Sequence, residues 1–229
     1  MQLIWLGHGS WRLETGDQVI LIDPWISSPV LPEDRRDEAI AGATQILVTH
    51  GHFDHTVDIV EVSRKTGAPV SGMYELANHL FSLGAVQGNA FNKGGVLQFG
   101  DAKITMVPAS HSSAMTVGDR AAYMGAETGF VIEAEGRTIY HSSDTTIMAD
   151  MEWIAEYFQP DIGILSAGGY YTMNMQAAAW AAKRYFDFKT VIPSHYRTFP
   201  ALEQTADALR AGLPGVEVIE PQVLSPIAL

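Results

Sequence analysis

Three histidines and one aspartate stand within six residues of this chain, in the run THGHFDH that covers residues 49–55. The apolar residues just before it (46–49, ILVT) are typical of a short buried strand, and a helical pattern follows from Thr56. Imidazoles this close repel one another when protonated, whereas a bound metal ion keeps them neutral. The run therefore predicts a metal site in a strand-to-helix loop, where His50 and His52 can serve one metal position and Asp54 and His55 a neighbouring one.

Three later side chains repeat this arrangement, each standing just after an apolar strand pattern. His111 follows ITMVPAS, Asp144 follows TIYHSS, and His195 follows TVIPS. Residues at strand ends on a rigid sheet are common hosts of chemistry. We therefore expect these three side chains to complete the site begun by the run at 49–55.

Composition limits both the ligands and the partners. The 229 residues include no cysteine, which leaves histidine and carboxylates as metal ligands and excludes disulfides and thiolate nucleophiles. Asp and Glu number 26 against 14 Lys and Arg, giving a net charge of −12. This excess of negative charge argues against nucleic acid and against anionic membranes as partners. A small-molecule substrate is the expectation, and association of identical chains remains open.

The chain shows neither a transmembrane segment nor a secretory signal. No stretch reaches the roughly 18 apolar residues that span a bilayer, and the start MQLIWLGHGS lacks a charged region before a long apolar run. We therefore expect a cytoplasmic protein.

Alternating strand and helix patterns predict one α/β domain over residues 1–229 with a mixed sheet. One hairpin runs into Asp23 and another leads toward Asp144. Two interpretations stay open: the chain has two halves of similar order, or these are two of the hairpins that are common in proteins. Strands are expected at 2–6, 11–22 (a hairpin turning at 15–17), 46–49, 96–99, 103–107, 130–140 (a hairpin turning at Gly136), 162–165 and 190–192. Helices are expected at 56–65, 74–83, 149–158, 175–186 with Asn174 as N-cap, and 201–211.

The segment Pro24–Thr44 has no periodicity and reads as an irregular loop with a mixed-charge run at 33–38. Two interpretations stay open for it. The charged run is a solvated face, or the segment is a lid over the site, since long loops are often functional.

Together these residues resemble the metallo-β-lactamase superfamily, in particular its small metal-dependent hydrolases related to ascorbate-6-phosphate lactonase and the N-acylphosphatidylethanolamine-hydrolysing phospholipase D. The resemblance covers nearly the whole chain. It is carried by LGHGS (6–10), IDP (22–24), THGHFDH (49–55), HSSDT (141–145) and IPSHYRTFP (192–200). It implies a four-layer αββα sandwich with a dinuclear site between the sheet edges.

The resemblance also implies a role for each ligand. One metal would be held by His50, His52 and His111, the second by Asp54, His55 and His195, with Asp144 bridging both. A hydroxide bridging two divalent metals would attack a small ester, lactone or phosphoester, and Asp54 would orient it as the catalytic residue. Zinc is the first choice, and manganese or iron suit the same ligands.

Other functions on the same scaffold are a nucleic-acid-processing phosphodiesterase or nuclease, an iron-dependent oxidoreductase, and a non-catalytic scaffold. The net charge argues against the first. His52 stands where di-iron flavoproteins carry a carboxylate, which argues against the second, and the complete ligand set argues against the third.

Several further residues have open roles. Asp23 is either an outer hydrogen-bond partner of the ligands or an Asp-Pro turn residue, and His8 and His141 stand near predicted site residues. His79 lies in a helical pattern and reads as structural. The side chains that could line a pocket or simply pack are Trp25, Tyr171, Met173 and Phe199.

Overall fold

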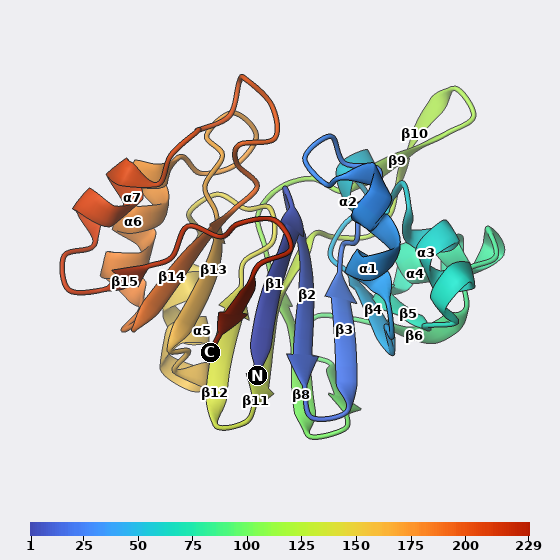
Figure 1. The fold of residues 1–229 in the computed structure, drawn as a ribbon, viewed down its shortest axis with the longest axis horizontal. Coiled ribbons are helices and arrows are strands. Elements are labelled where there is room, and N and C mark those ends of the chain that lie inside the picture. Colours follow the sequence, from blue (N-terminus) through green and yellow to red (C-terminus); the bar gives the residue numbers. More distant parts are fainter.

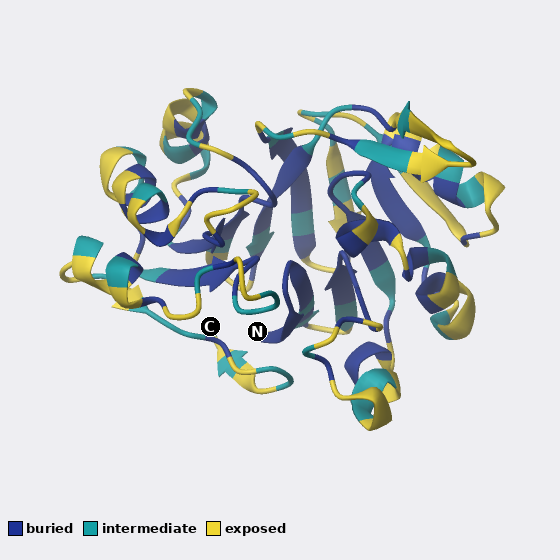
Figure 2. Ribbon diagram, turned by 90° about the horizontal axis from the view of Figure 1, so that it is seen from above, coloured by how far each residue is buried: buried dark blue, intermediate teal, exposed yellow.

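A computed structural model describes residues 1–229 and places two seven-stranded mixed sheets face to face, flanked by helices (Figure 1). One continuous hydrophobic core runs through both sheets. Viewed from above, the strands in the middle are buried and the helices on both sides expose one face (Figure 2). The expected α/β sandwich with helices outside two sheets is confirmed.

The first sheet has the order β16-β1-β2-β3-β4-β5-β6. Its strands are β16 (Pro226–Ala228), β1 (Gln2–Gly7), β2 (Ser10–Thr15), β3 (Gln18–Ile22), β4 (Gln45–Val48), β5 (Val70–Met73) and β6 (Gln87–Phe91). The second sheet has the order β15-β14-β13-β12-β11-β8-β7. Its strands are β15 (Glu217–Val218), β14 (Thr190–Ser194), β13 (Ile162–Ser166), β12 (Arg137–His141), β11 (Thr128–Ala134), β8 (Ala102–Pro108) and β7 (Val96–Phe99).

The two sheets share one topology. In each, an antiparallel hairpin (β2–β3 or β11–β12) leads into three parallel strands, β4 to β6 or β13 to β15. Asp23 directly follows β3, and Asp144 follows β12 after two serines. The similar order of the two halves suggested by the sequence is therefore present in the sheet topology.

Buried tryptophans join the two sheets near the site. Trp11 on β2 donates its indole N–H to the Ser194 hydroxyl on β14 at 3.0 Å. The Trp5 ring stacks on Tyr196 with 5.6 Å between centroids, and its indole N–H donates to the His8 carbonyl. Large aromatic side chains with satisfied polar atoms thus fix the first sheet against the loop that carries His195.

The helices are η1 (Glu33–Arg35, a 3-10 turn), α1 (Arg36–Ile40), α2 (Phe53–Thr56), α3 (Ile59–Thr66), α4 (Tyr74–Ser82), α5 (Asp150–Phe158), α6 (Met175–Tyr185) and α7 (Asp207–Gly212). The N-cap expected at Asn174 is present, since its side chain accepts from the Ala177 N–H at 2.8 Å. None of these helices combines the length and apolar character that crossing a bilayer requires.

Three sequence expectations are wrong in their boundaries. The helix expected at 56–65 is two helices, and the first begins inside the metal motif at Phe53. The helix expected at 201–211 begins only at Asp207, because the Glu203 backbone is held in hydrogen bonds to Gly168 and Arg197. The segment Pro24–Thr44 is not wholly irregular, because η1 and α1 lie within it.

The hairpin of β9 (Ala114–Val117) and β10 (Arg120–Tyr123) belongs to neither sheet and was not expected. It projects from the upper end of the molecule in Figure 1. Its base is anchored, because the Gly51 N–H donates to the Ser113 hydroxyl and the Met124 N–H donates to the Ser113 carbonyl. A side chain at Gly51 would collide with Met124, so glycine is required there.

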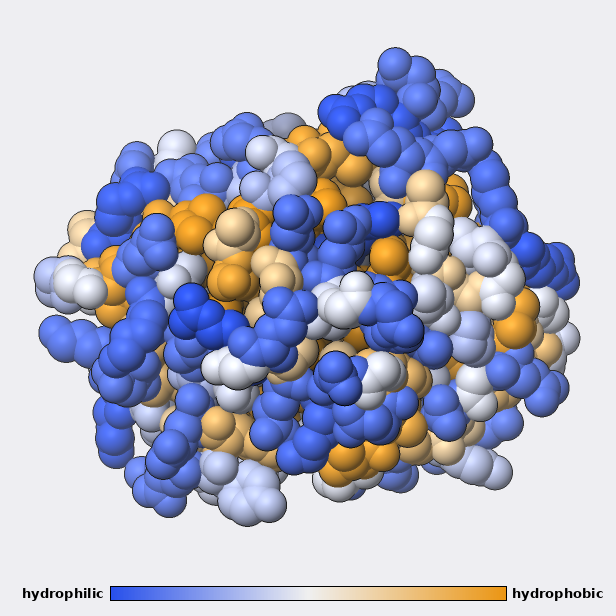
Figure 3. All heavy atoms as spheres, turned by 60° about the horizontal axis from the view of Figure 1, so that its bottom comes forward, coloured by the Kyte–Doolittle hydropathy of each residue, from blue (hydrophilic) through white to orange (hydrophobic).

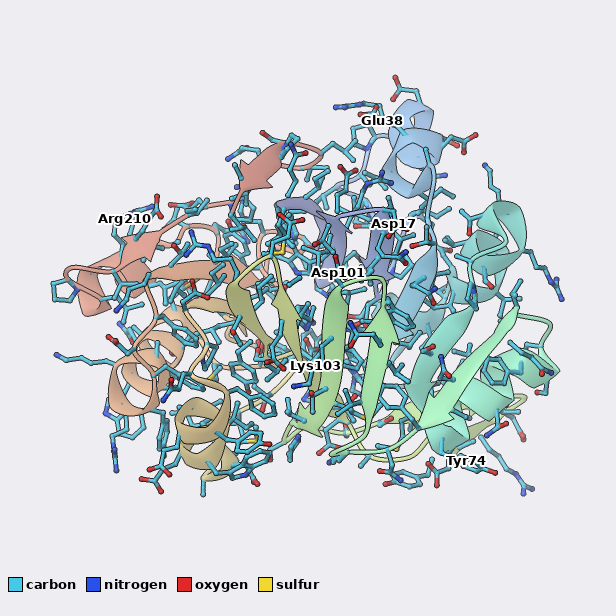
Figure 4. All side chains as sticks on the ribbon, turned by 90° about the horizontal axis from the view of Figure 1, so that it is seen from below. Asp17, Glu38, Tyr74, Asp101, Lys103 and Arg210 are labelled. Carbon is cyan, nitrogen blue, oxygen red and sulfur yellow. The ribbon has the colours of Figure 1, made fainter.

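The opposite, lower end of the sandwich is closed by short turns. Asp17 lies in the β2–β3 turn and Asp101 in the β7–β8 turn, and the two labelled residues lie close together in the view from below (Figure 4). The Glu135 carboxylate of the β11–β12 turn accepts from the Thr15 hydroxyl and the Gly16 N–H. With this end turned forward, the surface is mostly hydrophilic, with apolar side chains in small separate groups (Figure 3).

Candidate metal centre

All seven predicted ligand side chains meet at the upper end of the sandwich, where β4, β8, β12 and β14 end (Figure 1). The chain leaves β4 at Val48, and α2 begins four residues after Thr49, at Phe53. This tight connection brings the side chains of His50, His52, Asp54 and His55 close together. The seven side chains form two groups, and within each group the ligand atoms lie within 4.8 Å of one another.

The first, which we call the histidine group, consists of His50, His52 and His111. The Nδ1 atom of His52 lies 3.0 Å from Nε2 of His50 and 3.2 Å from Nε2 of His111. Three nitrogens bound tetrahedrally to one zinc ion lie about 3.3 Å apart. The observed separations are therefore close to those of a three-histidine metal site.

The second, which we call the acidic group, consists of Asp54, His55, Asp144 and His195, all of them buried. Nε2 of His195 lies 3.0 Å from Asp144 Oδ2 and 3.4 Å from Asp54 Oδ2. Nε2 of His55 lies 3.3 Å from Asp54 Oδ2 and 3.5 Å from Asp144 Oδ2. Two carboxylates thus face two imidazoles in a space from which water is largely excluded.

Asp144 lies between the two groups. Its Oδ2 atom is also 3.7 Å from Nε2 of His111 and 3.9 Å from Nε2 of His50. One carboxylate oxygen therefore has four imidazole nitrogens within 4 Å, two from each group. The Asp144 carboxylate is therefore shared by the two groups.

The two groups differ in charge. Burial lowers the pKa of His50 well below its ordinary value, and the nearby His55 adds to this effect. Burial and neighbouring histidines also lower the pKa of His52 and of His111. The histidine group is therefore uncharged at neutral pH, the form in which imidazole binds a metal.

In the acidic group, neighbouring charges overcome the cost of burial. Burial opposes a charge on His195, but Asp144 and Asp54 raise its pKa to about 9. Burial likewise opposes a charge on His55, and the surrounding carboxylates raise its pKa well above the ordinary value. Burial disfavours the carboxylates as well, yet these histidines hold the pKa of Asp54 and of Asp144 below its usual range. Without a cation, protons on the histidines balance the carboxylates, and a divalent ion would replace them.

Two buried ring nitrogens of the acidic group, Nε2 of His55 and Nδ1 of His195, have no hydrogen-bond partner. Nε2 of His55 is unpaired although its ring is buried, and it faces the two carboxylates. A buried polar atom without a partner is costly, and a cation bound between this nitrogen and the two carboxylates would satisfy it. Gly9 makes room for this ring, because a Cβ there would lie 2.8 Å from His55 Cε1. The donor set and this orphaned nitrogen fit a metal ion.

Asp23 supports both groups from behind. Its Oδ2 lies 2.8 Å from Nδ1 of His55, and it accepts from the Thr49 hydroxyl at 2.6 Å. That hydroxyl lies 2.9 Å from Nδ1 of His50. Asp23 thus makes outer hydrogen bonds, directly to His55 and through Thr49 to His50, of the kind that orients imidazoles at metal sites. This is the first of the two roles left open by the sequence.

His8 contacts the acidic group directly. Its Nε2 lies 2.8 Å from Asp54 Oδ2, and its Nδ1 lies 2.8 Å from the Thr198 hydroxyl. Burial lowers the pKa of His8 to about 4, so the ring is neutral and donates a hydrogen bond to the carboxylate. The His195 backbone N–H donates to the His8 carbonyl, which holds the two residues side by side.

Other residues named from the sequence lie outside the cluster or at its edge. His141 is buried and neither of its ring nitrogens has a partner, so it makes no hydrogen bond to a ligand. His79 lies on α4, away from the cavity. Tyr171 and Phe199 line the cavity above the two groups, whereas Trp25 and Met173 are buried and do not.

No residue of Pro24–Thr44 lines the cavity, whereas Ala114, Met115 and Thr116 of β9 do. Three hydroxyl side chains that contact histidines of the site were not predicted from the sequence. Thr49 lies beside His50, Thr198 beside His8, and the Ser112 hydroxyl lies 3.1 Å from Nε2 of His52. The Gly118-Asp119 turn between two short runs was the available signal for the β9–β10 hairpin.

Comparison with known proteins supports this assignment of fold and chemistry. Residues 18–212 match the family model of the beta-lactamase superfamily domain. The UPF0173 metal-dependent hydrolase of Paracoccus denitrificans is 58% identical over 230 residues and covers all of both chains. That of Ruegeria pomeroyi is 56% identical over 228 residues and covers 99% of each.

Among solved structures, Igni18, a metallo hydrolase from Ignicoccus hospitalis, is 32% identical with a TM-score of 0.82. The similarity covers 100% of this chain and 98% of Igni18. These relatives are named metal-dependent or metallo hydrolases, and the similarity extends over nearly the whole of each chain. This agrees with the cluster of histidines and carboxylates in this chain. The chain belongs to the beta-lactamase superfamily and, within it, to the UPF0173 metal-dependent hydrolases.

Proposed function

We propose that the histidine group and the acidic group each hold one divalent cation, that Asp144 bridges the two, and that the chain hydrolyses a small ester, lactone or phosphoester. Zinc is the first choice for both positions, with manganese or iron as alternatives, because imidazole and carboxylate ligands suit all three. Asp54 is the proposed catalytic residue. The substrate is a small molecule.

The observation that carries this proposal is the position of Asp144 Oδ2, which lies within 4 Å of imidazole nitrogens from both groups. A single cation would leave one group of nitrogens without a function. The two carboxylates offset half the charge of two divalent ions, and the remaining positive charge favours an anionic nucleophile.

When bound, such ions would lower the pKa of a water molecule and polarise the bond to be cleaved. The chain's own residues supply position and proton transfer. Asp54 lines the cavity, and its Oδ2 is held by the hydrogen bond from His8. From there it orients the attacking water, accepts a proton from it and passes that proton to the leaving oxygen.

The cavity is better suited to a small molecule than to nucleic acid. Its volume is about 800 Å³, within the range of small-ligand sites. No lysine or arginine lines it, whereas nucleic-acid backbones are bound chiefly through such cations.

Metal analysis tests the ligand assignment. We expect about two equivalents of divalent metal per purified chain, and a marked loss of metal in His52→Ala and Asp144→Ala. His79→Ala is the matched control, because it removes a histidine outside the cluster. Full metal content with unchanged activity in either ligand variant would overturn the proposal.

A substrate screen tests the reaction class. Metal-loaded protein is incubated with chromogenic esters, lactones, thioesters and phosphodiesters, beside single-stranded RNA and an oxygen-uptake assay. Hydrolysis of a small substrate that depends on Asp54 and on added metal supports the proposal. RNA cleavage as the main activity, or oxygen consumption without hydrolysis, would replace it with one of the two alternatives.

A further inference from the structure

We propose that the substrate is an uncharged carboxylic ester, open or cyclic, whose acyl chain is apolar and lies between α2 and the β9–β10 hairpin. This inference rests on the proposed hydrolase function and narrows its substrate class. It concerns the part of the substrate that lies away from the bond to be cleaved.

Apolar side chains surround the cavity above the two metal-binding groups. They come from α2 and the residue after it, from β9 and from two loops of the second half: Phe53, Val57, Ala114, Met115, Tyr171 and Phe199. Apolar side chains scattered singly over a surface need no explanation, but a group around one cavity marks a binding site.

Two of these side chains are exposed beside the ligands. Phe53 stands between His52 and Asp54 with 63% of its surface exposed, and Val57 one turn later is 54% exposed. Phe53 touches the Trp25 ring edge-on, with 5.6 Å between centroids, and is otherwise open to the cavity. Neither side chain is buried in the folded chain, so both remain available to bury an acyl chain.

The opposite wall comes from the β9–β10 hairpin. Ala114 and Met115 line the cavity from β9, and the hairpin is anchored at Ser113 by the hydrogen bond from Gly51. Because Gly51 lies between His50 and His52, this wall has a fixed position relative to the histidine group. Methionine fits irregular apolar ligands well, since its unbranched side chain adapts its shape.

The part of the cavity away from the two groups carries no charged side chain. Apart from Asp54 and Asp144 and the histidines of the cluster, the cavity is lined by no ionisable side chain except the Tyr171 phenol. A carboxylate or phosphate on the distant part of a substrate would lose its hydration there without gaining an ion pair. A neutral alkyl or aryl chain would instead gain from leaving water.

The reaction on such a substrate balances as a simple hydrolysis. The oxygen of water bonds to the acyl carbon, and the bond from that carbon to the leaving oxygen breaks. A proton passes through Asp54 to the leaving oxygen, giving an alcohol and a carboxylic acid, or one hydroxy acid from a cyclic ester.

A pair of substrates of equal length tests the charge preference. We expect metal-loaded protein to hydrolyse p-nitrophenyl hexanoate with a kcat/KM at least tenfold above that for mono-p-nitrophenyl adipate, which ends in a carboxylate. From the acetate to the hexanoate ester, kcat/KM should rise with each added methylene, by up to about fourfold per methylene. An equal or inverted preference would overturn this inference, while hydrolysis of either ester would leave the proposed function standing.

Two substitutions locate the acyl site. Val57→Lys should lower the preference for hexanoate over adipate by at least tenfold, because it places a cation in the lining. Val96→Lys is the control, since Val96 is 52% exposed on β7 and does not line the cavity. Met115→Ala should flatten the rise with chain length. A preference that changes in neither Val57→Lys nor Met115→Ala would place the acyl chain elsewhere and refute the assignment.

Binding provides a readout that needs no turnover. Line broadening in ¹⁹F NMR should show 1,1,1-trifluoro-2-octanone binding to the metal-free protein more tightly than 1,1,1-trifluoroacetone, with Met115→Ala reducing the difference. Equal affinities would overturn the acyl site whether or not metal binds. Selective binding in a protein that takes up no metal would instead support the site and contradict the proposed function.

Discussion

The two ends of the sandwich differ in which residues adopt left-handed backbone conformations in the connections between strands. At the upper end, His8, Asp23, Ser143 and His195 adopt left-handed backbone conformations, with φ between +46° and +56°. At the lower end, glycines take most such positions, as in the turns at Gly16, Gly100 and Gly136. Glycine adopts these conformations without strain, whereas in other residues they raise the free energy of the folded chain.

This difference shows where side-chain chemistry was required. A strained residue persists only where its surroundings hold it in place, and such residues are frequent at functional sites. His8 and Asp23 fit this description, because each hydrogen-bonds a residue of the acidic group. The lower end carries none of the seven predicted ligand side chains, so its turns can use glycine.

The largest expected contrast between the two ends concerns activity. Asp54→Asn removes the proposed proton acceptor and should lower kcat by at least about 100-fold, the usual contribution of such a group. Asp17→Asn makes the same change in a lower turn and should leave kcat unaltered (Figure 4). Steady-state kinetics on a substrate from the screen checks both. Retention of kcat in Asp54→Asn would show that this carboxylate does not carry the proton.

The next contrast concerns metal affinity. Asp23→Asn keeps the side-chain size but weakens the outer hydrogen bonds to His55 and, through Thr49, to His50, so metal affinity should fall by about 10- to 100-fold. Asp58→Asn is the matched control, because Asp58 is also buried but bonds the Ser27 N–H. Competition with a chromophoric chelator measures both affinities. Equal affinities in the two variants would assign Asp23 to the turn alone.

A smaller effect is expected from His8, which acts through Asp54. His8→Ala removes a hydrogen bond to a carboxylate and should lower kcat about tenfold with little change in KM. His8→Gln can place an amide N–H near the same position and should recover part of this loss. The Tm together with the split between kcat and KM distinguishes positioning from simple destabilisation, because positioning lowers kcat while Tm and KM stay close to wild type. An unchanged kcat in His8→Ala would contradict the role.

Much of the fold was predictable because its signals are local. The hairpin turns at Gly16 and Gly136, the N-cap at Asn174 and the short apolar strands are each visible within about ten residues of sequence. The α/β sandwich and the superfamily resemblance are confirmed. One domain over residues 1–229 stays a prediction, supported by the continuous core.

The elements that escaped prediction depend on distant contacts. β6 (Gln87–Phe91) is a largely exposed edge strand without hydrophobic alternation, and it forms because β5 offers it a partner. Residues 201–206 have a helical composition, but pairing with Gly168 and Arg197 outweighs that local preference. A single sequence contains no signal for such competition.

The site divides in the same way. Residues 50–55 and the three later strand-end ligands were visible as pattern, and the structure brings all seven together, while their role in binding metal stays a prediction. Thr198 and Ser112 were not visible, because a hydroxyl becomes an outer partner only once the chain has folded.

A weaker effect is expected at the upper end, where the buried His141 should make the folded chain less stable in acid. Burial lowers the pKa of His141 to about 4, so between pH 6.5 and 4 the unfolded chain binds more protons at this residue than the folded one. Because of this residue, the free energy of unfolding should therefore fall by about 1 kcal/mol when the pH falls from 7.5 to 5.5. His141→Leu should remove this part of the pH dependence, measured by urea unfolding of metal-free protein. An unchanged slope would contradict the neutral buried state.

The smallest effect is expected at the lower end, from Glu135. A hydrogen bond from the N-terminal ammonium group, with others from Thr15 and Gly16, lowers the pKa of Glu135 to about 2. A lowered carboxylate pKa stabilises the folded chain above its unfolded value near 4.5, and this stabilisation disappears as pH falls through 2. The sign is thus opposite to that of an Asp or Glu destabilised by burial.

Glu135→Gln should lower Tm by no more than a few degrees at pH 7, because an exposed ion pair contributes little. The variant and wild type should converge near pH 2, and activity should be unchanged at every pH where both are folded. A loss of activity in Glu135→Gln without loss of Tm would break the separation of the two ends, since no residue of the lower turns belongs to the histidine group or the acidic group. Equal Tm values from pH 7 to pH 2 would show that the turn is held by its backbone conformation alone.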